Sequence, residues 1–259
     1  MDMPRNRFRA ALREGRHQLG LWNAIPGATA IEIAAAAGFD WVVIDLEHGP
    51  MDIPDVLPAL QVVAAYPGVS AVVRPAANDA AAIKRLLDMG AQTLLIPMVS
   101  TAAEAEAAAR AMRYAPEGTR GLAGIHRASR WGRVPGYAAA APDELCLVVQ
   151  VESREGLENL EAIAGTPGVD GVFIGPSDLA ASLGHLADPD HAEVQDAIAD
   201  AIARLRAAGV PSGILAVDEA GARARMEAGT AFTAAGIDAM ILARGLDALR
   251  AAMRDHRGD

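Results

Sequence analysis

The chain has 259 residues, and its 23 lysine and arginine residues against 33 aspartate and glutamate residues give a formal net charge of −10. Hydrophobic residues make up 52% of the chain and aromatic residues only 4%, which is typical of a soluble globular protein with an aliphatic, alanine-rich interior. The acidic balance argues against nucleic acid as a partner, because binding phosphates requires a basic surface, and against attachment to anionic lipid.

The N-terminal region carries charges throughout and contains no apolar segment, so we expect no signal peptide. The longest run without charges, residues 56–73, is interrupted by Pro58 and by the Pro67-Gly68 turn. It therefore predicts a helix, a turn and a buried strand rather than a membrane span. Cys146 is the only cysteine and cannot form an intrachain disulfide, which favours a reducing compartment. These features predict a cytoplasmic protein.

An alanine-rich helical stretch that ends in glycine and leads into a short aliphatic run recurs along the chain, as in AAAAGFDWVVID and LLDMGAQTLLIP. Glycine just past a helix end supplies a left-handed residue, and an aliphatic run without alternation is typical of a strand buried on both faces. Together with less regular cases, this pattern predicts eight strands, which are Leu19–Trp22, Trp41–Asp45, Ala71–Arg74, Thr93–Pro97, Leu145–Glu152, Gly171–Gly175, Ser212–Ala216 and Ala231–Gly236.

Helix-length segments such as Thr101–Tyr114 and His191–Ala208 lie between most of these strands. Alternating strands and helices imply parallel pairing through right-handed crossovers, and eight such units predict an α/β fold of the (β/α)8 TIM barrel type. An open doubly wound sheet is the alternative, disfavoured because no Gly-x-Gly-x-x-Gly motif follows the first strand. No linker divides the chain, so residues 1–259 are predicted to form one domain. The longest stretch without clear periodicity is Arg120–Asp143.

Candidate functional residues lie where the predicted strands end, because barrels of this kind build their active sites at the carboxyl ends of the strands. Residues two apart on a strand point to the same side, so Gln150 and Glu152 share a face, as do Asp45 and Glu47. The polar residues at or just after the strand ends are Asp45, Glu47, His48, Arg74, Gln150, Glu152, Asp178 and Asp218.

Glu152 and Asp178 are carboxylates at consecutive strand ends, with no cysteine or histidine beside them. Such a pair suits a hard ion that prefers oxygen ligands and keeps several waters, which favours Mg²⁺ or Mn²⁺ over Zn²⁺. Both residues also have a structural interpretation. Asp178 can cap the helix that follows it, and Glu152 can pair with a neighbouring basic side chain.

His48 and Arg74 offer proton transfer and anion binding. A carboxylate near an imidazole orients it for acid–base chemistry, and Asp45 lies three residues before His48; a purely structural histidine fits this spacing equally well. Arg74 ends an aliphatic strand and must find an anion, which is either a substrate or an internal partner, Asp45 or Glu47. Arg120, in the long loop, is a second candidate for binding an anion, although an ordinary exposed loop arginine is the favoured interpretation.

Several stretches occur together in one order, namely GLWNAIPG, DWVVIDLEHGPMD, AVVRP, LVVQVESREG and GVFIGPSDLAASLGH. They resemble the HpcH/HpaI aldolase family, the metal-dependent class II pyruvate aldolases that act on 2-keto acids. The resemblance is dense from Leu19 to His185 and looser beyond. It implies a divalent metal ion, Mg²⁺ or Mn²⁺ with Co²⁺ as a further candidate. It also implies a homohexamer in which the last helix is exchanged between neighbouring barrels.

The resemblance implies the roles of the residues around the ion. Glu152 and Asp178 match the two protein ligands of the divalent ion, and Glu47 matches an acceptor for water bound to it. Gln150 matches a residue that contacts the keto acid or its ordered waters. Ser177, beside Asp178, is assigned to substrate binding as well.

The resemblance also implies the residues that act on the substrate. Arg74 matches the arginine beside the keto oxygen, placed to stabilise an enolate. His48 with Asp45 matches an acid–base dyad that acts directly or through a water. Trp22 matches an aromatic wall against the pyruvate end, and Arg120 is kept as a further substrate contact.

The predicted function is reversible aldol cleavage of 4-hydroxy-2-keto acids to pyruvate, or hydroxypyruvate, and an aldehyde by a carbon–carbon lyase. A metal-dependent oxaloacetate decarboxylase or related lyase is the alternative, because it would protonate the same enolate. From another class, a catalytically silent barrel that binds a keto acid is disfavoured by the polar residues at the strand ends. A phosphate-binding barrel would have a glycine-rich loop after strands seven and eight, and the segments there, ILAVDEAG and TAAGID, support it only weakly.

Lysine chemistry is disfavoured, because Lys84 is the only lysine and lies on a predicted helix, whereas a Schiff base needs an amine inside the barrel. The expected partners are therefore a keto acid, an aldehyde and further copies of the chain, with neither nucleic acid nor membrane.

Overall fold

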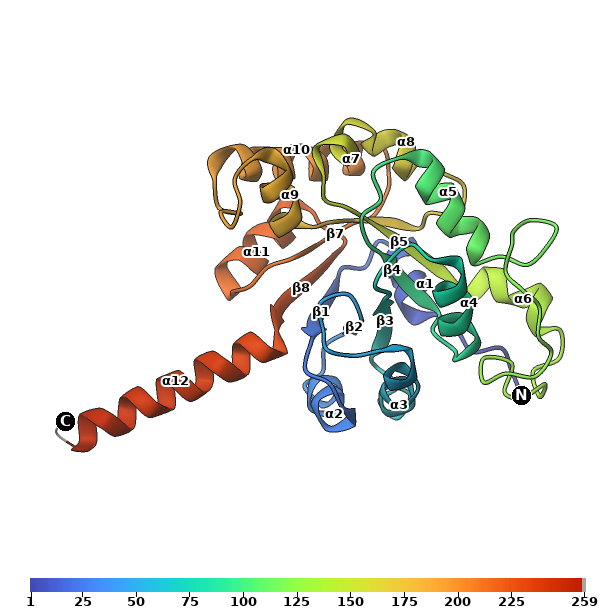
Figure 1. The fold of residues 1–259 in the computed structure, drawn as a ribbon, viewed down its shortest axis with the longest axis horizontal. Helices are drawn as coiled ribbons and strands as arrows, with labels where there is room; N and C mark the ends of the chain where they lie inside the picture. Colours follow the sequence, from blue (N-terminus) through green and yellow to red (C-terminus); the bar gives the residue numbers. More distant parts are fainter. Residues whose placement is uncertain (258–259) are drawn as a thin grey trace.

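The computed structural model describes residues 1–257, with the side chains up to residue 254 (Figure 1). Its parallel strands close into a barrel in sequence order, with β8 pairing with β1. This closed barrel confirms the predicted fold and excludes the open doubly wound sheet. The strands are β1 (Gln18–Asn23), β2 (Trp41–Asp45), β3 (Ser70–Arg74), β4 (Thr93–Ile96), β5 (Cys146–Val151), β6 (Gly171–Ile174), β7 (Ser212–Leu215) and β8 (Phe232–Ile237).

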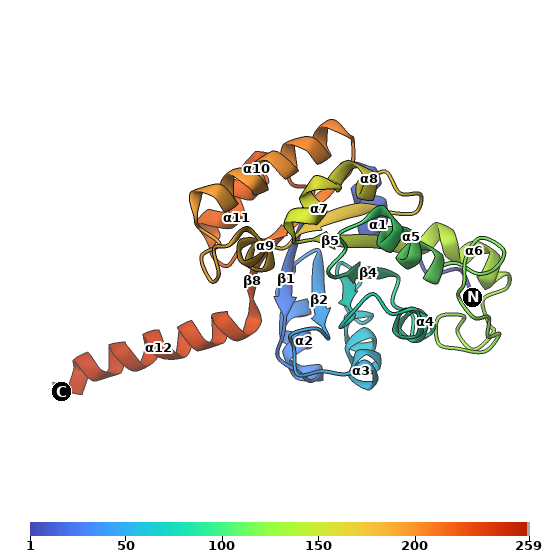
Figure 2. The same cartoon turned by 45° about the horizontal axis from the view of Figure 1, so that its top comes forward.

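Helices surround the barrel, and most lie in the connections between successive strands (Figures 1 and 2). They are α1 (Arg7–Arg13), α2 (Ala28–Ala36), α3 (Ile53–Val63), α4 (Ala80–Asp88), α5 (Ala102–Ala111), α6 (Tyr137–Glu144), α7 (Arg154–Glu158), α8 (Leu160–Ala164), α9 (Pro176–Leu183), α10 (Ala192–Ala207), α11 (Glu219–Ala228) and α12 (Asp238–Arg257).

The predicted strands agree closely with the observed ones, and β2 matches at both ends. The charge-free run is a helix, a turn and a strand, as predicted, since it covers α3 and β3. Two segments differ from the expectation. Helix α1 was not predicted because it is short and lies in a charged segment, and the end of the aperiodic stretch Arg120–Asp143 forms most of α6.

The barrel interior combines aromatic rings with aliphatic side chains from the strands, so a chain with few rings places most of them where they pack together. Phe8 of α1 is fully buried against Trp41 and Phe232, with ring centroids 5.7 and 5.4 Å apart in edge-to-face contact. Gly20 and Gly213 leave room for these rings, because a Cβ at either would overlap the ring of Trp41 or Phe232. Helix α1 thus closes the amino-terminal end of the barrel.

The register of the sheet brings predicted site residues side by side. Strands β2 and β3 pair so that Asp45 lies opposite Arg74 at their carboxyl ends. Strands β5 and β6 pair from Val148 and Gly171 to Val151 and Ile174, so the segments that follow leave the barrel together. The residues that precede these strand ends are apolar and mostly buried, so the polar side chains lie at the carboxyl ends. Because all strands are parallel, these ends meet at one rim of the barrel.

Helix α12 extends away from the barrel in both views (Figures 1 and 2). Its main contacts with the strands are to β8, which it directly follows, and to the neighbouring β1. None of the helices within residues 1–257 is long and apolar enough to cross a membrane.

Candidate active site

Asp45 and Arg74 form a buried, doubly bonded ion pair at the ends of β2 and β3. Arg74 Nε donates to Asp45 Oδ1 at 2.8 Å, and its Nη2 donates to Oδ2 at 2.7 Å. Both residues are at most 4% exposed. Burial by itself would raise the pKa of Asp45, but the hydrogen bonds and positive charge of Arg74 outweigh it and hold the pKa below its ordinary value. The carboxylate is therefore ionised and fixes the guanidinium.

Arg74 has two further contacts that orient it. Its Nη1 lies 2.7 Å from Glu47 Oε2, and its guanidinium carbon lies 4.6 Å from the centre of the Trp22 ring. The indole nitrogen of Trp22 donates to Asp45 Oδ2 at 3.1 Å. Arg74 thus forms ion pairs with both of its candidate internal partners, Asp45 and Glu47, and Trp22 stacks on its guanidinium.

His48 lies just beyond β2, with an exposed imidazole. Its backbone N–H, together with that of Glu47, donates to Asp45 Oδ1, at 3.4 and 3.0 Å. Among the residues that the structure describes, no hydrogen bond joins the imidazole to Asp45. The imidazole of His48 and the carboxylate of Asp45 therefore do not form the expected hydrogen-bonded dyad. Arg74, Trp22 and the two backbone N–H groups already occupy the Asp45 oxygens.

Glu152 directly follows β5 and is 3% exposed. Its Oε1 accepts from the backbone N–H of Met98 at 2.8 Å, and its Oε2 accepts from the side-chain amide of Gln150. Burial raises the pKa of Glu152 to about 7, against these two hydrogen bonds, and the charges of Asp178 and Glu47 add to the rise. Glu152 has no basic partner within 4.0 Å among the described residues, so its predicted structural role as an ion-pair member is wrong.

The Met98 backbone amide is a site contact that sequence reasoning missed. Met98 has a φ of 54°, an uncommon value for a residue other than glycine. The one available signal was its position just after β4, but nothing in the residue type predicts a donor to Glu152.

Asp178 lies in the first turn of α9, close enough to Glu152 for their charges to interact. The N-cap of α9 is Gly175, so the alternative in which Asp178 caps this helix is wrong. A side chain at Gly175 would overlap the Glu152 carboxylate and lie 3.0 Å from Gln150 Nε2. Glycine is needed here because β6 turns into α9 directly over Glu152.

The donor set at these strand ends fits a hard divalent cation. Glu47, Glu152 and Asp178 are three carboxylates within mutual electrostatic reach. Gln150 Oε1 is buried, and it has no hydrogen-bond partner among the described residues. A cation with oxygen ligands would neutralise the carboxylates, and its bound water would supply a partner for Gln150.

Three further predicted residues fall in different places. Ser177 is exposed beside Asp178 in the first turn of α9. Asp218 caps α11 and accepts from the Gly221 N–H at 2.8 Å, which is a structural role. Arg120 is not part of this site, contrary to the expectation.

Arg120 is fully buried and pairs with Asp88 at 2.7 Å. Asp88 is the last residue of α4, which returns from the end of β3 toward the start of β4. Arg120 therefore lies toward the opposite end of the barrel from Glu152 and Asp178. The loop containing it folds back beside α4, which its spacing in the sequence does not indicate.

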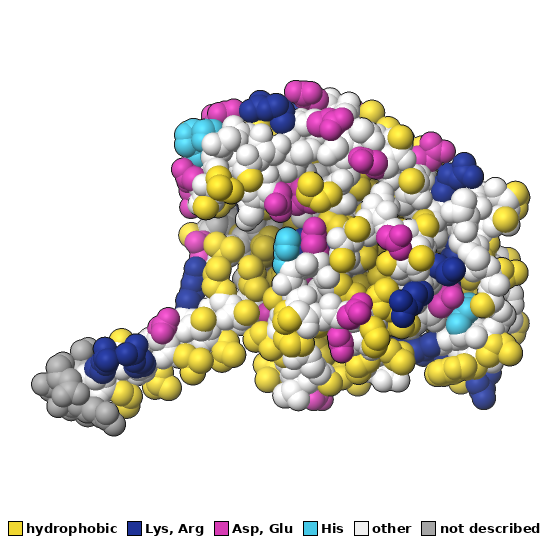
Figure 3. Space-filling view, viewed as in Figure 1, with side chains coloured by type: hydrophobic (Ala, Val, Ile, Leu, Met, Phe, Trp, Pro, Cys, Tyr) yellow, Lys and Arg dark blue, Asp and Glu magenta, His cyan; other side chains and the backbone are white. Residues whose placement is uncertain are grey.

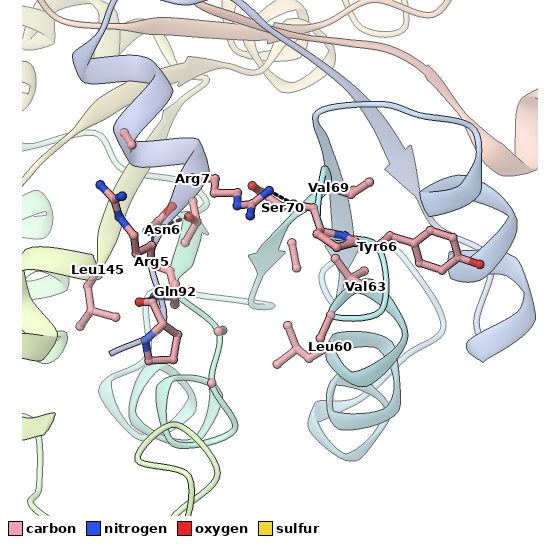
Figure 4. Close-up of a pocket in the computed structure, with 18 of the residues that line it drawn as sticks. Arg5, Asn6, Arg7, Leu60, Val63, Tyr66, Val69, Ser70, Gln92 and Leu145 are labelled. Carbon is pink, nitrogen blue, oxygen red and sulfur yellow. Dashed lines mark hydrogen bonds between the residues drawn. The ribbon is translucent and has the colours of Figure 1, made fainter. Parts of the chain in front are cut away.

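A large groove of about 830 Å³ lies at that opposite end (Figure 4). Its lining includes the first residues of β1, β3 and β4, namely Gln18, Ser70 and Thr93. Arg7 spans part of it by donating to the backbone carbonyl of Pro67 (Figure 4). None of the strand-end site residues lines this groove.

Comparison with known proteins supplies the family. A sequence profile described as HpcH/HpaI aldolase/citrate lyase matches residues 18–245. A Rhizobium etli protein named pyruvate aldolase is 56% identical over 97% of this chain and 98% of its own length. A Pseudomonas aeruginosa protein named hydroxypyruvate/pyruvate aldolase is 53% identical over 95% of this chain and 92% of its own. The crystal structure of an HpcH/HpaI aldolase/citrate lyase family protein from Burkholderia cenocepacia has a TM-score of 0.92 at 41% identity, covering 97% of this chain and 99% of that one. The chain therefore belongs to the HpcH/HpaI aldolase/citrate lyase family.

Proposed function

We propose that the chain is a divalent-metal-dependent carbon–carbon lyase that reversibly cleaves 4-hydroxy-2-keto acids to pyruvate, or hydroxypyruvate, and an aldehyde. The observation that carries this proposal is the arrangement at one barrel rim. The carboxylates of Glu47, Glu152 and Asp178 gather there, together with the guanidinium of Arg74, which is held rigidly by Asp45. The names of the Rhizobium and Pseudomonas relatives support both donor ketones.

In this proposal Glu152 and Asp178 hold the cation, with Mg²⁺ or Mn²⁺ suiting their oxygen donors and Co²⁺ a further candidate. When bound, such an ion supplies Lewis-acid polarisation of the substrate's keto group. Met98 N–H and Gln150 orient Glu152 through its two oxygens. Glu47, which pairs with Arg74, would accept a hydrogen bond from water bound to such an ion.

Arg74 stabilises the negative charge that develops on the keto oxygen. When the bond between C3 and C4 of the substrate breaks, its electrons pass into the keto acid fragment and form an enolate. A guanidinium already fixed by Asp45 and Glu47 needs little reorganisation at that moment, which is the condition for effective electrostatic stabilisation. Trp22 keeps the guanidinium plane in place from one side.

His48 moves the proton. Its imidazole accepts the proton of the 4-hydroxyl group as the aldehyde forms, directly or through a water, and a proton is then delivered to C3 of the enolate. The reverse sequence gives aldol addition. Asp45 fixes the loop through the His48 backbone N–H and holds Arg74, so it positions both groups without touching the imidazole.

Gln150 and Ser177 are the proposed contacts for the keto acid. The free Oε1 of Gln150 faces no partner among the described residues, and the Ser177 hydroxyl is exposed beside Asp178. No side chain among the described residues caps α9, so the backbone N–H groups of its first turn after Pro176 suit a carboxylate, because the first turn of a helix attracts anions.

A substrate panel tests the reaction class. The protein is incubated with pyruvate or hydroxypyruvate and a series of aldehydes, with EDTA, Mg²⁺ or Mn²⁺, and the products are followed by chromatography. We expect aldol products that depend on the added metal. Oxaloacetate is included as a substrate, and carbon dioxide release without any aldol product would instead identify a decarboxylase.

Substitutions at the two proposed ligands test the metal assignment. We expect Glu152→Gln and Asp178→Asn to weaken Mn²⁺ binding, measured by electron paramagnetic resonance, and to lower kcat by at least about a hundredfold. Glu155→Gln, an exposed control nearby in the sequence, keeps both properties. Normal Mn²⁺ binding in both ligand variants would refute the assignment.

We also propose that the chain works as a homo-oligomer, a hexamer as the resemblance implies, in which α12 packs on a neighbouring barrel. The helix presents large apolar side chains to solvent at Ile241, Leu242, Leu246, Leu249 and Met253 (Figure 3).

We further propose that the protein is cytoplasmic. Cys146 is buried and unpaired, which suits the reducing conditions of that compartment.

A further inference from the structure

A second group of potential metal ligands lies on the surface, where α9 leads into α10. His185 follows the end of α9 by two residues, His191 is the N-cap of α10, and Glu193 is in its first turn. One ligand atom from each of the three lies within 4.8 Å of the others. Figure 3 shows histidine and acidic side chains gathered at the corner of the molecule where α9 and α10 lie.

The contacts within this group hold the three side chains together. His185 Nε2 lies 2.8 Å from Glu193 Oε2. The imidazoles of His185 and His191 are stacked, with centroids 3.5 Å apart and planes 15° apart. Ligand atoms of a tetrahedral zinc ion are separated by about 3.4 Å, as follows from bond lengths near 2.1 Å. Nearly parallel stacked rings do not direct two nitrogens at one ion, so metal binding requires the two imidazoles to rotate out of the stack.

Two existing interactions compete with metal binding at these side chains. One uses a different atom of Glu193, and the other can be replaced by a bond to the metal. Arg154 approaches Glu193 on Oε1, at 3.6 Å, and leaves Oε2 to face His185. His191 Nδ1 accepts from the Glu193 N–H at 3.2 Å. Coordination through Nε2 of His191 moves its proton to Nδ1 and exchanges this capping hydrogen bond for a metal–nitrogen bond.

The donor set differs in kind from that of the strand ends. Two imidazoles and one carboxylate suit Zn²⁺, Ni²⁺ or Cu²⁺, whereas an all-oxygen set suits Mg²⁺ or Mn²⁺. We propose that His185, His191 and Glu193 form a surface site for a borderline transition-metal ion, Zn²⁺ in the first instance, with water completing its coordination. Five residues of α9, about 7.5 Å at 1.5 Å per residue, follow Asp178 before the helix ends ahead of His185, and no strand-end carboxylate belongs to this group, so the two sites are distinct.

Zinc titration of the full-length chain tests the proposal independently of its activity. Asp178→Asn is introduced first, so that the strand-end carboxylate pair is broken and the surface site is measured alone. Calorimetric titration with ZnCl₂ is expected to show one site per chain, retained in a large excess of Mg²⁺. His185→Ala or His191→Ala in that background weakens binding by at least about tenfold, the loss typical even of an outer-sphere partner.

Asp190→Asn is the matched control, since it removes an exposed acidic side chain beside the cluster without removing a ligand. Co²⁺ in place of Zn²⁺ gives a second readout, because its visible absorption reports nitrogen ligands; the bands are expected to disappear with His185→Ala. Circular dichroism verifies that each variant is folded. Zinc binding that is lost in Asp178→Asn alone, or that survives both histidine substitutions, would overturn the surface site.

Discussion

Asp45 makes no hydrogen bond to the imidazole it was expected to orient, yet it organises the site by holding Arg74. The carboxylate accepts two hydrogen bonds from the guanidinium, one from Trp22 and two from the backbone that follows β2. Such a bidentate pair fixes the direction of the arginine as well as its charge. The position of Arg74 therefore depends on a residue that need not touch the substrate.

Asp45→Asn tests this dependence. The amide retains the shape of the side chain but supplies one acceptor oxygen in place of two, and it leaves Glu47 as the only carboxylate partner of Arg74. We expect kcat to fall by about a hundredfold, as for the loss of a transition-state hydrogen bond. We expect the unfolding free energy to fall by up to about 3 kcal/mol, at the low end for a broken buried pair because Glu47 remains. Urea denaturation and steady-state kinetics measure the two effects, with the exposed Asp196→Asn as control.

The stability loss in Asp45→Asn has a pH dependence of known sign. The folded-state pKa of Asp45 is lowered, so its stabilising contribution is complete above the unfolded-state pKa of about 3.9 and disappears as pH falls through the lower folded value. The difference in unfolding free energy between the two proteins should therefore be constant near neutral pH and shrink below about pH 4. Glu47 is present in both proteins, and because the charge of Asp45 raises the pKa of Glu47, that pKa is expected to be lower in the variant. A difference that stays constant into strong acid would contradict the ion pair.

At the scale of elements, the turn from β6 into α9 passes directly over the buried carboxylate of Glu152. Gly175 makes this possible: its φ of −93° is open to any residue, so the constraint is space rather than backbone conformation. A Cβ there would lie 2.8 Å from the Cβ of Glu152 and would have to displace it. The element that supplies Asp178 thereby also determines the position of Glu152.

Gly175→Ala should consequently impair the site without unfolding the barrel. We expect Mn²⁺ affinity and kcat to fall by about ten- to a hundredfold, because a displacement near 1 Å is enough to disrupt a catalytic arrangement. Gly124→Ala is the matched control, since a Cβ at Gly124 meets nothing within 4 Å. Unchanged metal affinity in Gly175→Ala would mean that Glu152 can move aside without loss and does not bind the ion.

The whole molecule has one feature that a closed barrel does not explain, the apolar face of α12. Leu242, Leu246, Leu249 and Met253 recur at helical spacing and are each 53–60% exposed. Large apolar side chains gathered on one helix face of this kind mark an interaction surface.

Leu246→Glu combined with Leu249→Glu tests the assembly. Charges on this face should prevent its burial on a neighbouring barrel, and light scattering after size-exclusion chromatography should report a particle of lower mass. Asp247→Asn changes the same turn of the helix without adding charge and should leave the mass unchanged. If the double variant keeps the assembled mass, α12 is not at the interface.

The fold was largely predictable because its signals are local. Strands buried on both faces are continuous apolar runs such as WVVID, and glycines mark the helix ends before them, so the strand count follows from short stretches. Helix α1 escaped prediction because its one fully buried ring, Phe8, lies within a charged segment, and its packing against Trp41 is tertiary.

The sequence by itself determined the barrel and the polar residues at its strand ends, since alternation and order along the chain are enough to place strand ends at one rim. Only the tertiary structure decided which groups meet there. Sheet register pairs Asp45 with Arg74, and a loop after β4 turns the Met98 N–H toward Glu152. The same folding carries Arg120 to the opposite end beside α4. These outcomes depend on side-chain direction and on contacts between distant residues, which no local pattern contains.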